Sequence, residues 1–430
     1  MKIKALKKEY DEVMSLPKEP RKKPKRPNFF FRTLMKVLSA PELRSLNFKC
    51  RKTGMDRLGK GEPCLYLMNH SAFIDLKIAM SLLYPRPINI VCTTDAFVGQ
   101  SWLLRSIGCI PAKKFVTDFS LVKDVKYALD KLKDSILMYP EASYTFDGTA
   151  TPLPDTLGKF IKSLGIPVVM IRTYGAFARD PLYNNLKLRK VDVSADMDYI
   201  LSPEEIKEMD SDEILRIIND RFTFDNFKWQ KESGVKITEP FRADYLNRVL
   251  YKCPCCGVEG KMTGSGTTLR CLSCGKEYEL TEDGEMCAQN GETEFSHIPD
   301  WYNFERESVK EEILNGTYSL KVPVDIAMMV DTKAVYMVGE GELAHDREGF
   351  RLEGCGGKLS YSQKPLASYS LYADYNWYEI GDVICIGGGD VFYYCFPKGA
   401  GDVVAKTRLA TEELYKIVRA EKRGAALTEQ

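Results

Sequence analysis

Histidine is scarce in this sequence, with three among 430 residues. No apolar run approaches the roughly 18 residues that a membrane-spanning helix needs, so we expect any membrane contact to be peripheral. We see no apolar signal segment at the amino end, and the count of 13 cysteines is odd, which argues against a disulfide framework. We therefore expect a cytoplasmic protein.

Charge is balanced over the whole chain but not at its start. The formal net charge is +1, whereas residues 1–60 hold 18 Lys/Arg against 6 Asp/Glu. Such a basic segment suits phospholipid head groups or nucleic acid. In FFFRTLMKVL, residues 29–38, apolar side chains alternate with Arg32 and Lys36, which is typical of an interfacial helix; packing on the protein body is the other interpretation. We expect this basic, Phe-rich N-terminal arm to contact the inner face of the membrane, and residues 1–27 to lack regular structure.

Short apolar runs alternate with helical patterns in the next part of the chain. CLYLMN, INIVCTT, SILMYPE and IPVVMIRTYG read as strands, and segments such as FIDLKIAMSLLY between them read as helices. This alternation predicts an α/β domain with a mostly parallel sheet, for which we set the bounds 61–248. Short Gly- and aromatic-punctuated runs later predict a small antiparallel β domain with a terminal helix, residues 300–425, somewhat similar in pattern to a pleckstrin-homology module.

A cysteine-rich stretch, CPCCGVEGKMTGSGTTLRCLSCG, separates these two parts, within residues 249–282. Two Cys-x-x-Cys pairs with 14 residues between them supply four thiolates for a tetrahedral Zn²⁺, so we predict a structural zinc ribbon. The predicted ligands are Cys253, Cys256, Cys271 and Cys274. Cys255 fits the first pair less well, although a change of register would bring it in, and redox switching is the other interpretation. With few aromatic residues between its basic ones, we do not expect the ribbon to bind nucleic acid.

The rare His70 lies beside Asn69 and close to Asp75 in the stretch LYLMNHSAFIDLKIAM. In an unbroken helix a step of five residues turns about 500°, so the side chains of His70 and Asp75 would face apart. They meet if a strand ends at Met68 and a helix begins near Ala72. Asp75 would then bind one imidazole nitrogen while the other accepts a proton from a substrate hydroxyl. The other interpretation is a plain loop histidine and a carboxylate that stabilises the helix start.

The segment NHSAFID resembles the first motif, Asn-His-x₄-Asp, of the glycerolipid acyltransferases, whose best-known members are 1-acyl-sn-glycerol-3-phosphate acyltransferases. Three further segments resemble that family in the same order: GCIPAKK, YPEASYTFDG and GIPVVMI. In the family, the basic end of the second motif helps to bind the acceptor's phosphate, and here Lys113 and Lys114 stand where arginine is preferred. The resemblance covers residues 61–200.

The third motif departs from the family pattern in its middle. Its Pro-Glu pair, which contains Glu141, and its Asp-Gly turn fit the family. Ala142, Ser143 and Tyr144 replace the family's Gly, Thr and Arg. Because a neutral phenol cannot supply the bidentate, charge-assisted contact of a guanidinium, Tyr144 leaves open whether the acceptor is a simple phosphomonoester.

The resemblance implies an O-acyltransferase that moves a fatty acyl group from acyl-CoA or acyl carrier protein to a hydroxyl of a lysophospholipid or related glycerol lipid. It implies His70 as general base, Asp75 as its orienting partner, and the acceptor hydroxyl as nucleophile. It also implies these substrate-binding residues: Asn69, Lys113, Lys114, Glu141, Ser143 and Tyr144. The alternative is a catalytically inactive acyltransferase fold that binds lipid or protein through its zinc ribbon and β domain.

Overall fold

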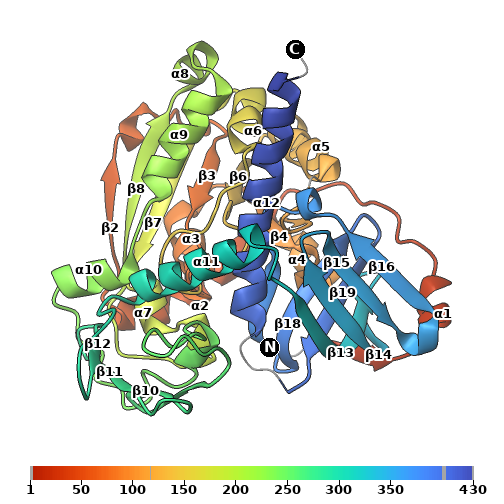
Figure 1. Cartoon of the computed structure of the whole chain (residues 1–430). Helices are drawn as coiled ribbons and strands as arrows, with labels where there is room; N and C mark the ends of the chain where they lie inside the picture. The colour runs from red at the N-terminus through yellow and green to blue at the C-terminus, as the bar shows by residue number, and fades with distance from the viewer. Residues whose placement is uncertain (1–2, 117, 400–402, 429–430) are drawn as a thin grey trace. The chain divides into compact units, whose positions relative to one another are not determined.

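The computed structural model describes residues 3–116, 118–399 and 403–428 (Figure 1). Within these residues, no helix combines the length and the apolar character needed to cross a membrane. The chain divides into two compact units, which we call the α/β unit and the β-rich unit. The α/β unit comprises residues 20–181 and 186–235, and the β-rich unit comprises residues 1–19, 182–185 and 236–430.

A seven-stranded sheet forms the centre of the α/β unit, in the order β2-β8-β7-β3-β6-β4-β5. Its neighbouring strands are parallel except for the pair β7 and β8. The predicted α/β fold with a mostly parallel sheet is therefore confirmed. In chain order the strands are β2 (Lys49–Thr53), β3 (Leu65–Met68), β4 (Ile88–Thr93), β5 (Cys109–Ala112), β6 (Ser135–Met138), β7 (Val168–Tyr174) and β8 (Ser194–Leu201).

Helices cover both faces of this sheet, as alternate side chains of β3 show. Tyr66 and Met68 belong to a core that includes α3, whereas Leu65 and Leu67 belong to a second core that includes α6 and α9. Both faces of β3 are therefore buried, which explains its continuous apolar run. The helices are α2 (Phe29–Ser45), α3 (Ile74–Leu83), α4 (Ser101–Ser106), α5 (Phe119–Tyr127), α6 (Leu157–Leu164), α7 (Ala176–Arg179), α8 (Pro203–Glu208), α9 (Ser211–Phe222) and α10 (Asn226–Glu232).

The β-rich unit contains a larger antiparallel sheet in the order β16-β15-β14-β13-β19-β18-β17 and the helices α11 and α12. The predicted antiparallel β domain with a terminal helix is confirmed, and its likeness to a pleckstrin-homology module stays a prediction. The elements are α11 (Ile298–Leu314), β13 (Leu320–Met329), β14 (Val335–Asp346), β15 (Gly349–Gly354), β16 (Leu359–Gln363), β17 (Tyr372–Trp377), β18 (Gly381–Gly388), β19 (Val391–Pro397) and α12 (Val403–Thr428).

The beginning of the chain belongs to this same sheet, which corrects the prediction that residues 1–27 lack regular structure. Strand β1 (Ala5–Lys7) pairs in parallel with Val335–Met337 of β14, and α1 (Tyr10–Met14) follows it. Strand β15 pairs only with the later part of β14, so β1 takes hydrogen-bonding groups that β15 leaves open. The basic composition of this segment favours no local structure, and β1 forms because it pairs with β14.

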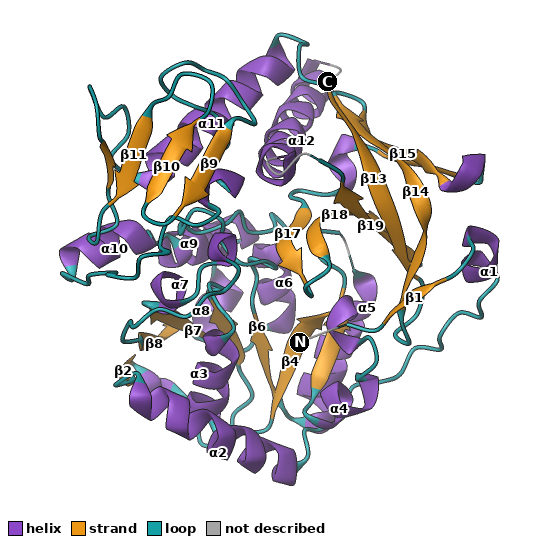
Figure 2. Cartoon of the chain, turned by 90° about the horizontal axis from the view of Figure 1, so that it is seen from below, coloured by secondary structure: helices purple, strands orange, loops and turns teal. Residues whose placement is uncertain are grey.

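The cysteine-rich segment forms a small antiparallel sheet in the order β12-β11-β10-β9 (Figure 2). Its strands are β9 (Met262–Ser265), β10 (Thr268–Cys271), β11 (Glu277–Leu280) and β12 (Met286–Ala288). The segment is attached to α11 and α12 of the β-rich unit. On α11, Trp301 donates its indole N–H to the carbonyl of Lys252 at 2.9 Å, and on α12, Lys406 contacts Glu259 at 2.6 Å.

Candidate active site and metal centre

Neighbouring strands carry several of the predicted site residues to one end of the sheet. One rung of the sheet joins Tyr66 (β3), Leu137 (β6), Val169 (β7), Ile90 (β4) and Cys109 (β5). His70, Glu141, Thr173 and Lys113 each lie four residues beyond the rung residue of their own strand. The carboxyl ends of parallel strands meet at one edge, where open α/β sheets bind their ligands. Chain positions far apart in sequence are thus aligned at this edge.

His70, in the loop between β3 and α3, meets Asp75 in the first turn of α3. Nδ1 of His70 lies 3.4 Å from Oδ2 of Asp75. As predicted, the strand ends at Met68, whereas the helix begins at Ile74 rather than near Ala72. The carboxylate is fully buried and the imidazole is 25% exposed. The separation is longer than the usual upper limit of about 3.2 Å for a hydrogen bond of this kind.

Three further donors hold the Asp75 carboxylate in place. Its Oδ2 accepts the backbone N–H groups of Ser71 at 2.7 Å and Ala72 at 3.0 Å. Its Oδ1 accepts the hydroxyl of Thr173 at 3.2 Å. Asp75 therefore lies in the first turn of α3, binds the loop that precedes the helix, and also faces His70. One carboxylate thus meets both descriptions that its position in the sequence suggested.

Asn69 joins the end of β3 to β7. Its Oδ1 accepts the backbone N–H of Thr173 at 2.8 Å, and its Nδ2 donates to the carbonyl of the same residue at 3.3 Å. Sequence reasoning missed Thr173, because the fourth motif ends at Ile171 and only the pairing of β3 with β7 brings Thr173 to the site. No local pattern in the sequence marks it.

Glu141 is buried and binds the backbone on both sides of the site. Its Oε2 accepts the N–H of His70 at 2.8 Å, and its Oε1 accepts the N–H of Thr151 at 2.8 Å. Burial raises the pKa of Glu141 to about 7, although these backbone hydrogen bonds offset part of the rise. The carboxyl group therefore changes charge near neutral pH while it positions the main chain of His70.

Two tyrosine rings contact the imidazole of His70. The centroid of its ring lies 4.3 Å from that of Tyr139 and 4.4 Å from that of Tyr144. Tyr144 therefore lies against the predicted base itself. Burial raises the pKa of Tyr139 well above its usual value, with the charge of Asp75 as the next cause. The phenol of Tyr139 is thus neutral.

The turn between these tyrosines is strained and contains an orphaned polar atom. Ala142, which replaces the family's glycine, has a φ of 58°, in the left-handed region that favours glycine. The hydroxyl of Ser143 is buried and has no hydrogen-bond partner among the described residues. An unsatisfied buried hydroxyl beside the imidazole loop is a group that a bound substrate can engage.

The two lysines of the second motif directly follow β5. Strand β5 is three positions from β3 in the sheet, and an interstrand spacing of about 4.8 Å places Lys113 and Lys114 roughly 14 Å from the loop of His70. The N–H of Lys113 donates to Oδ2 of Asp118 at 3.3 Å. These lysines lie on the same edge of the sheet as His70.

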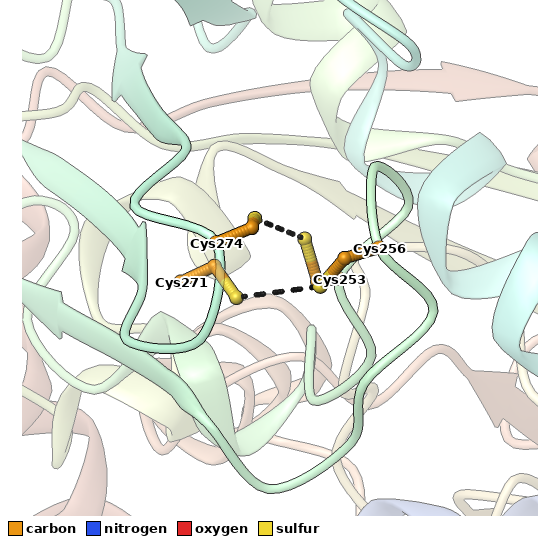
Figure 3. A group of neighbouring side chains, drawn as sticks. All are labelled: Cys253, Cys256, Cys271 and Cys274. Atoms are coloured by element: carbon orange, nitrogen blue, oxygen red, sulfur yellow. Dashed lines mark hydrogen bonds between the residues drawn. The ribbon is translucent and has the colours of Figure 1, made fainter.

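The four predicted metal ligands cluster in the β-rich unit (Figure 3). Their Sγ atoms all lie within 4.8 Å of one another, with Cys253 3.8 Å from Cys274 and Cys256 3.8 Å from Cys271. A tetrahedral zinc with Zn–S bonds of 2.3 Å requires sulfurs about 3.8 Å apart, so the group fits Zn²⁺. Cys255 is exposed and is not part of this cluster.

Comparison with known proteins gives a family match for part of the α/β unit. Residues 49–173 match the model of the acyltransferase family. They form an acyltransferase-family domain. The domain contains β2 to β6, all but the last residue of β7, and every predicted site residue outside the cysteine cluster.

A curated relative and a solved structure resemble this acyltransferase domain. The chain is 26% identical over 133 residues to the chloroplastic 1-acyl-sn-glycerol-3-phosphate acyltransferase BAT2 of Brassica napus, a match that covers 30% of this chain and 38% of the relative. The crystal structure of the 1-acyl-sn-glycerophosphate acyltransferase PlsC from Thermotoga maritima aligns with a TM-score of 0.33 and 13% identity, over 44% of this chain and 76% of that one. The chain thus spans well under half the length of the curated relative.

Proposed function

We propose that this protein is an O-acyltransferase that transfers a fatty acyl group from a thioester to a hydroxyl of a lysophospholipid or related glycerol lipid. The observation that carries the proposal is the contact between His70 and Asp75 at the edge of an acyltransferase-family sheet. Glu141 supports it, because its carboxyl group holds the backbone of His70.

In the proposed reaction, Nδ1–H of His70 points to Asp75 and Nε2 removes the proton of the acceptor hydroxyl. The hydroxyl oxygen attacks the thioester carbonyl, and the resulting tetrahedral oxyanion collapses with cleavage of the C–S bond. The imidazolium returns its proton to the departing thiolate, so the products are an ester and a free thiol. Base assistance of this kind contributes about 10²- to 10⁴-fold to the rate, and Asp75 stabilises the imidazolium.

Backbone donors for the oxyanion are limited in this loop. The N–H groups of Ser71 and Ala72 are bound to Asp75, and that of His70 is bound to Glu141. The unpartnered hydroxyl of Ser143 is therefore our proposed polar contact to the substrate from the third motif. Lys113 and Lys114 are proposed to bind an anionic group of the substrate farther along the sheet edge.

The same chemistry leads us to propose an acyl donor, a membrane contact and a metal ion. The donor is acyl-CoA or acyl carrier protein, and the lipid acceptor requires access to a membrane surface. We propose that the basic N-terminal arm contacts this surface. Cys253, Cys256, Cys271 and Cys274 would hold a Zn²⁺ whose four thiolate ligands leave no open position, so the metal would serve only to fold the ribbon.

The test is an acyl-transfer assay with acyl-CoA or acyl carrier protein and a panel of lysolipid acceptors. Wild type is compared with His70→Ala and with His297→Ala, a histidine in the β-rich unit. We expect ester formation by wild type and by the control, and a loss of at least about 10²-fold in kcat for His70→Ala. Full activity of His70→Ala would exclude the proposed base. Failure of wild type on every acceptor would favour the non-catalytic scaffold.

A further inference from the structure

An open cavity of about 650 Å³ lies at the carboxyl end of β7 in the α/β unit, with α10 on one side (Figure 1). We call it the β7 cavity. Among the described residues, its lining includes three aromatic rings, two cationic side chains and two carboxylates, but none of the site residues placed above. A volume of this size holds a small molecule or a lipid head group. The rings and charges indicate what kind of ligand it binds.

Two of the rings, Phe224 and Trp229, line the cavity and pack against the third, Tyr174. The centroid of the Tyr174 ring lies 5.2 Å from that of Phe224 and 6.2 Å from that of Trp229. Phe224 stands at 85° to Tyr174, and Trp229 is tilted by 35°. Ring faces attract cations through their π electrons, and converging rings are the chemistry that recognises a quaternary ammonium group. Phe224 and Trp229 therefore favour a ligand that carries such a cation.

Arg172 brings an incompletely satisfied guanidinium to the same cavity. Its Nε is buried and has no hydrogen-bond partner among the described residues. Asp196, opposite Arg172 in the pairing of β7 with β8, is already bound through both carboxylate oxygens by Arg51. The remaining capacity of Arg172 suits a phosphate, because guanidinium N–H groups bind phosphate oxygens in a charge-assisted, bidentate way.

Charges of both signs around the cavity restrict the class of phosphate. Asp225, which caps the start of α10, and Glu232, its last residue, supply carboxylates. Lys228 lies 4.0 Å from Glu232, and both side chains are more than half exposed, so this pair forms the rim. A phosphomonoester or a nucleotide would bring two or more negative charges beside these carboxylates. A head group that joins one phosphate to one ammonium group instead offers each charged side chain a partner of opposite sign.

The loop after β6 connects this cavity to the proposed base. Thr149 and Ala150 line the cavity, and the N–H of the next residue, Thr151, donates to Glu141 at 2.8 Å. The other carboxyl oxygen of Glu141 accepts the N–H of His70 at 2.8 Å. These two hydrogen bonds place the backbone nitrogens of Thr151 and His70 within about 8 Å of each other. The wall of the cavity is therefore close to His70.

The length of a lysophospholipid head group matches this separation. About eight covalent bonds lie between the free glycerol hydroxyl and the ammonium nitrogen, which gives a span of roughly 10 Å. Arg172 directly precedes Thr173, so their side chains point to opposite faces of β7. A head group whose hydroxyl is at His70 therefore crosses the edge of the sheet to reach Arg172.

We infer that the β7 cavity binds the zwitterionic head group of a phospholipid, a phosphodiester joined to a quaternary ammonium group. Arg172 binds the phosphate, and Phe224 and Trp229 hold the ammonium group, whose charge the carboxylate of Asp225 balances. The inference rests on the proposed function in taking this phospholipid as the acyl acceptor. It also explains why position 144 can hold a tyrosine, because the phosphate is bound from β7 rather than from the third motif.

Calorimetric titration of the full-length protein with sn-glycero-3-phosphocholine tests this cavity. The probe carries the phosphodiester and the quaternary ammonium group without acyl chains, so binding is measured without a membrane or an acyl donor. We expect wild type to bind it. Arg172→Gln and Trp229→Leu should each bind at least about tenfold more weakly, because one removes the partner of the phosphate and the other a ring that holds the cation.

Arg216→Gln and Trp102→Leu are the matched controls. They make the same two substitutions outside the cavity, at side chains that are 66% and 73% exposed, and should bind as wild type does. In wild type, sn-glycerol 3-phosphate should bind at least about tenfold more weakly than the probe, because it lacks the ammonium group. This comparison needs no variant, so it tests the inference even where a substitution in the cavity prevents folding.

Further measurements separate head-group binding from catalysis. His70→Ala should bind the probe normally, and Arg172→Gln should raise KM for lysophosphatidylcholine while kcat stays nearly constant. Binding of the probe by a protein that acylates no acceptor would retain the head-group site and refute the proposed function. Three results would overturn the inference: no binding of the probe by wild type, equal binding by wild type and Arg172→Gln, or equal binding of sn-glycerol 3-phosphate. Displacement of the probe by adenosine 3′,5′-bisphosphate would also overturn it and assign the cavity to a nucleotide.

Discussion

The backbone N–H of His70 donates to Oε2 of Glu141 at 2.8 Å. Glu141, from the third family motif, therefore holds the main chain of His70, from the first motif. Its other oxygen, Oε1, binds Thr151, so the loop after β6 and the loop after β3 are fixed to each other. A change in the charge or hydrogen bonding of Glu141 is thus transmitted directly to the position of His70.

Replacing Glu141 with Gln should remove part of the pH dependence of stability. Burial raises the pKa of Glu141 from 4.5 to about 7. The folded protein then binds this proton more tightly than the unfolded chain, so the free energy of unfolding falls as pH rises from about 4.5 to 7. A shift of this size corresponds to about 3 kcal/mol. In urea titrations at about pH 5 and about pH 8, wild type should lose that much more stability than Glu141→Gln.

The comparison of the two proteins isolates Glu141 from other titrating groups. Burial also raises the pKa of Asp180 to about 7, but Asp180 is present in both proteins and its contribution cancels. Parallel stability profiles for wild type and variant would mean that Glu141 is already ionised at low pH in the folded protein.

The substitution Ala142→Gly should stabilise the α/β unit. Ala142 has a φ of 58°, where a side chain costs about 1–2 kcal/mol, and the greater freedom of glycine in the unfolded chain offsets up to about 1 kcal/mol of the gain. We expect a net increase of about 0.5–1 kcal/mol in the free energy of unfolding, measured by urea titration. Ala150→Gly in the same loop is the control, because Ala150 lies outside the left-handed region and should gain nothing.

Thr173→Val should impair catalysis without weakening substrate binding. Thr173 donates its hydroxyl to Oδ1 of Asp75, so valine leaves that carboxylate oxygen without its donor and lets it move relative to His70. Hydrogen bonds to charged groups contribute about 1.5–3 kcal/mol, so kcat should fall about tenfold or more while KM stays nearly constant. The acidic limb of the pH–rate profile should also move, because a general base must be unprotonated to act, and loss of folding alone would not cause this.

Tyr174→Phe is the matched control for Thr173→Val. It removes a hydroxyl that also donates to an aspartate, Asp196, from the neighbouring position of β7. Its side chain points to the opposite face of the strand. Equal loss of kcat in the two variants would show that β7 as a whole matters, rather than the contact to Asp75.

The parts of the fold that could be predicted are those whose cause is local in sequence. Strands β3, β4, β6 and β7 are short apolar runs because the sheet is covered on both faces. Strand β2 has the sequence KCRKT and is mostly exposed, so only its pairing with β8 makes it a strand. Strand β1 likewise depends on its partner β14. Pairing between distant segments leaves little trace in composition.

The candidate site divides in the same way. His70, Asp75 and Glu141 lie in linear motifs, and the structure brings them together. Thr173 reaches the site only because β3 pairs with β7 in the observed register. The contact of the Tyr144 ring with His70 depends on the conformation of the loop after β6. The sequence shows only that a tyrosine replaces the family's arginine, so it could not predict this contact.

The cysteine cluster predicts one zinc ion per chain, bound by Cys253, Cys256, Cys271 and Cys274. Cys256→Ser removes one of four ligands and should abolish tight metal binding, and Cys255→Ser should leave it intact. Both side chains are exposed, so packing changes little in either variant. Zinc content by mass spectrometry and thermal unfolding with and without a chelator check this, because removal of a structural metal destabilises the folded state. Zinc loss in Cys255→Ser instead would establish the alternative register.

The contact between Tyr144 and His70 makes position 144 a test of acceptor choice. Its ring lies 4.4 Å from the imidazole, so an arginine there would place a guanidinium beside the reacting hydroxyl. Because a guanidinium binds phosphate in a bidentate, charge-assisted way, Tyr144→Arg should raise kcat/KM for 1-acylglycerol 3-phosphate relative to monoacylglycerol by about tenfold or more. Tyr144→Phe keeps the ring without a cation and should leave the ratio unchanged. The same ratio in all three proteins would mean that the acceptor's head group does not reach the third motif, and that Lys113 and Lys114 alone are left to bind it.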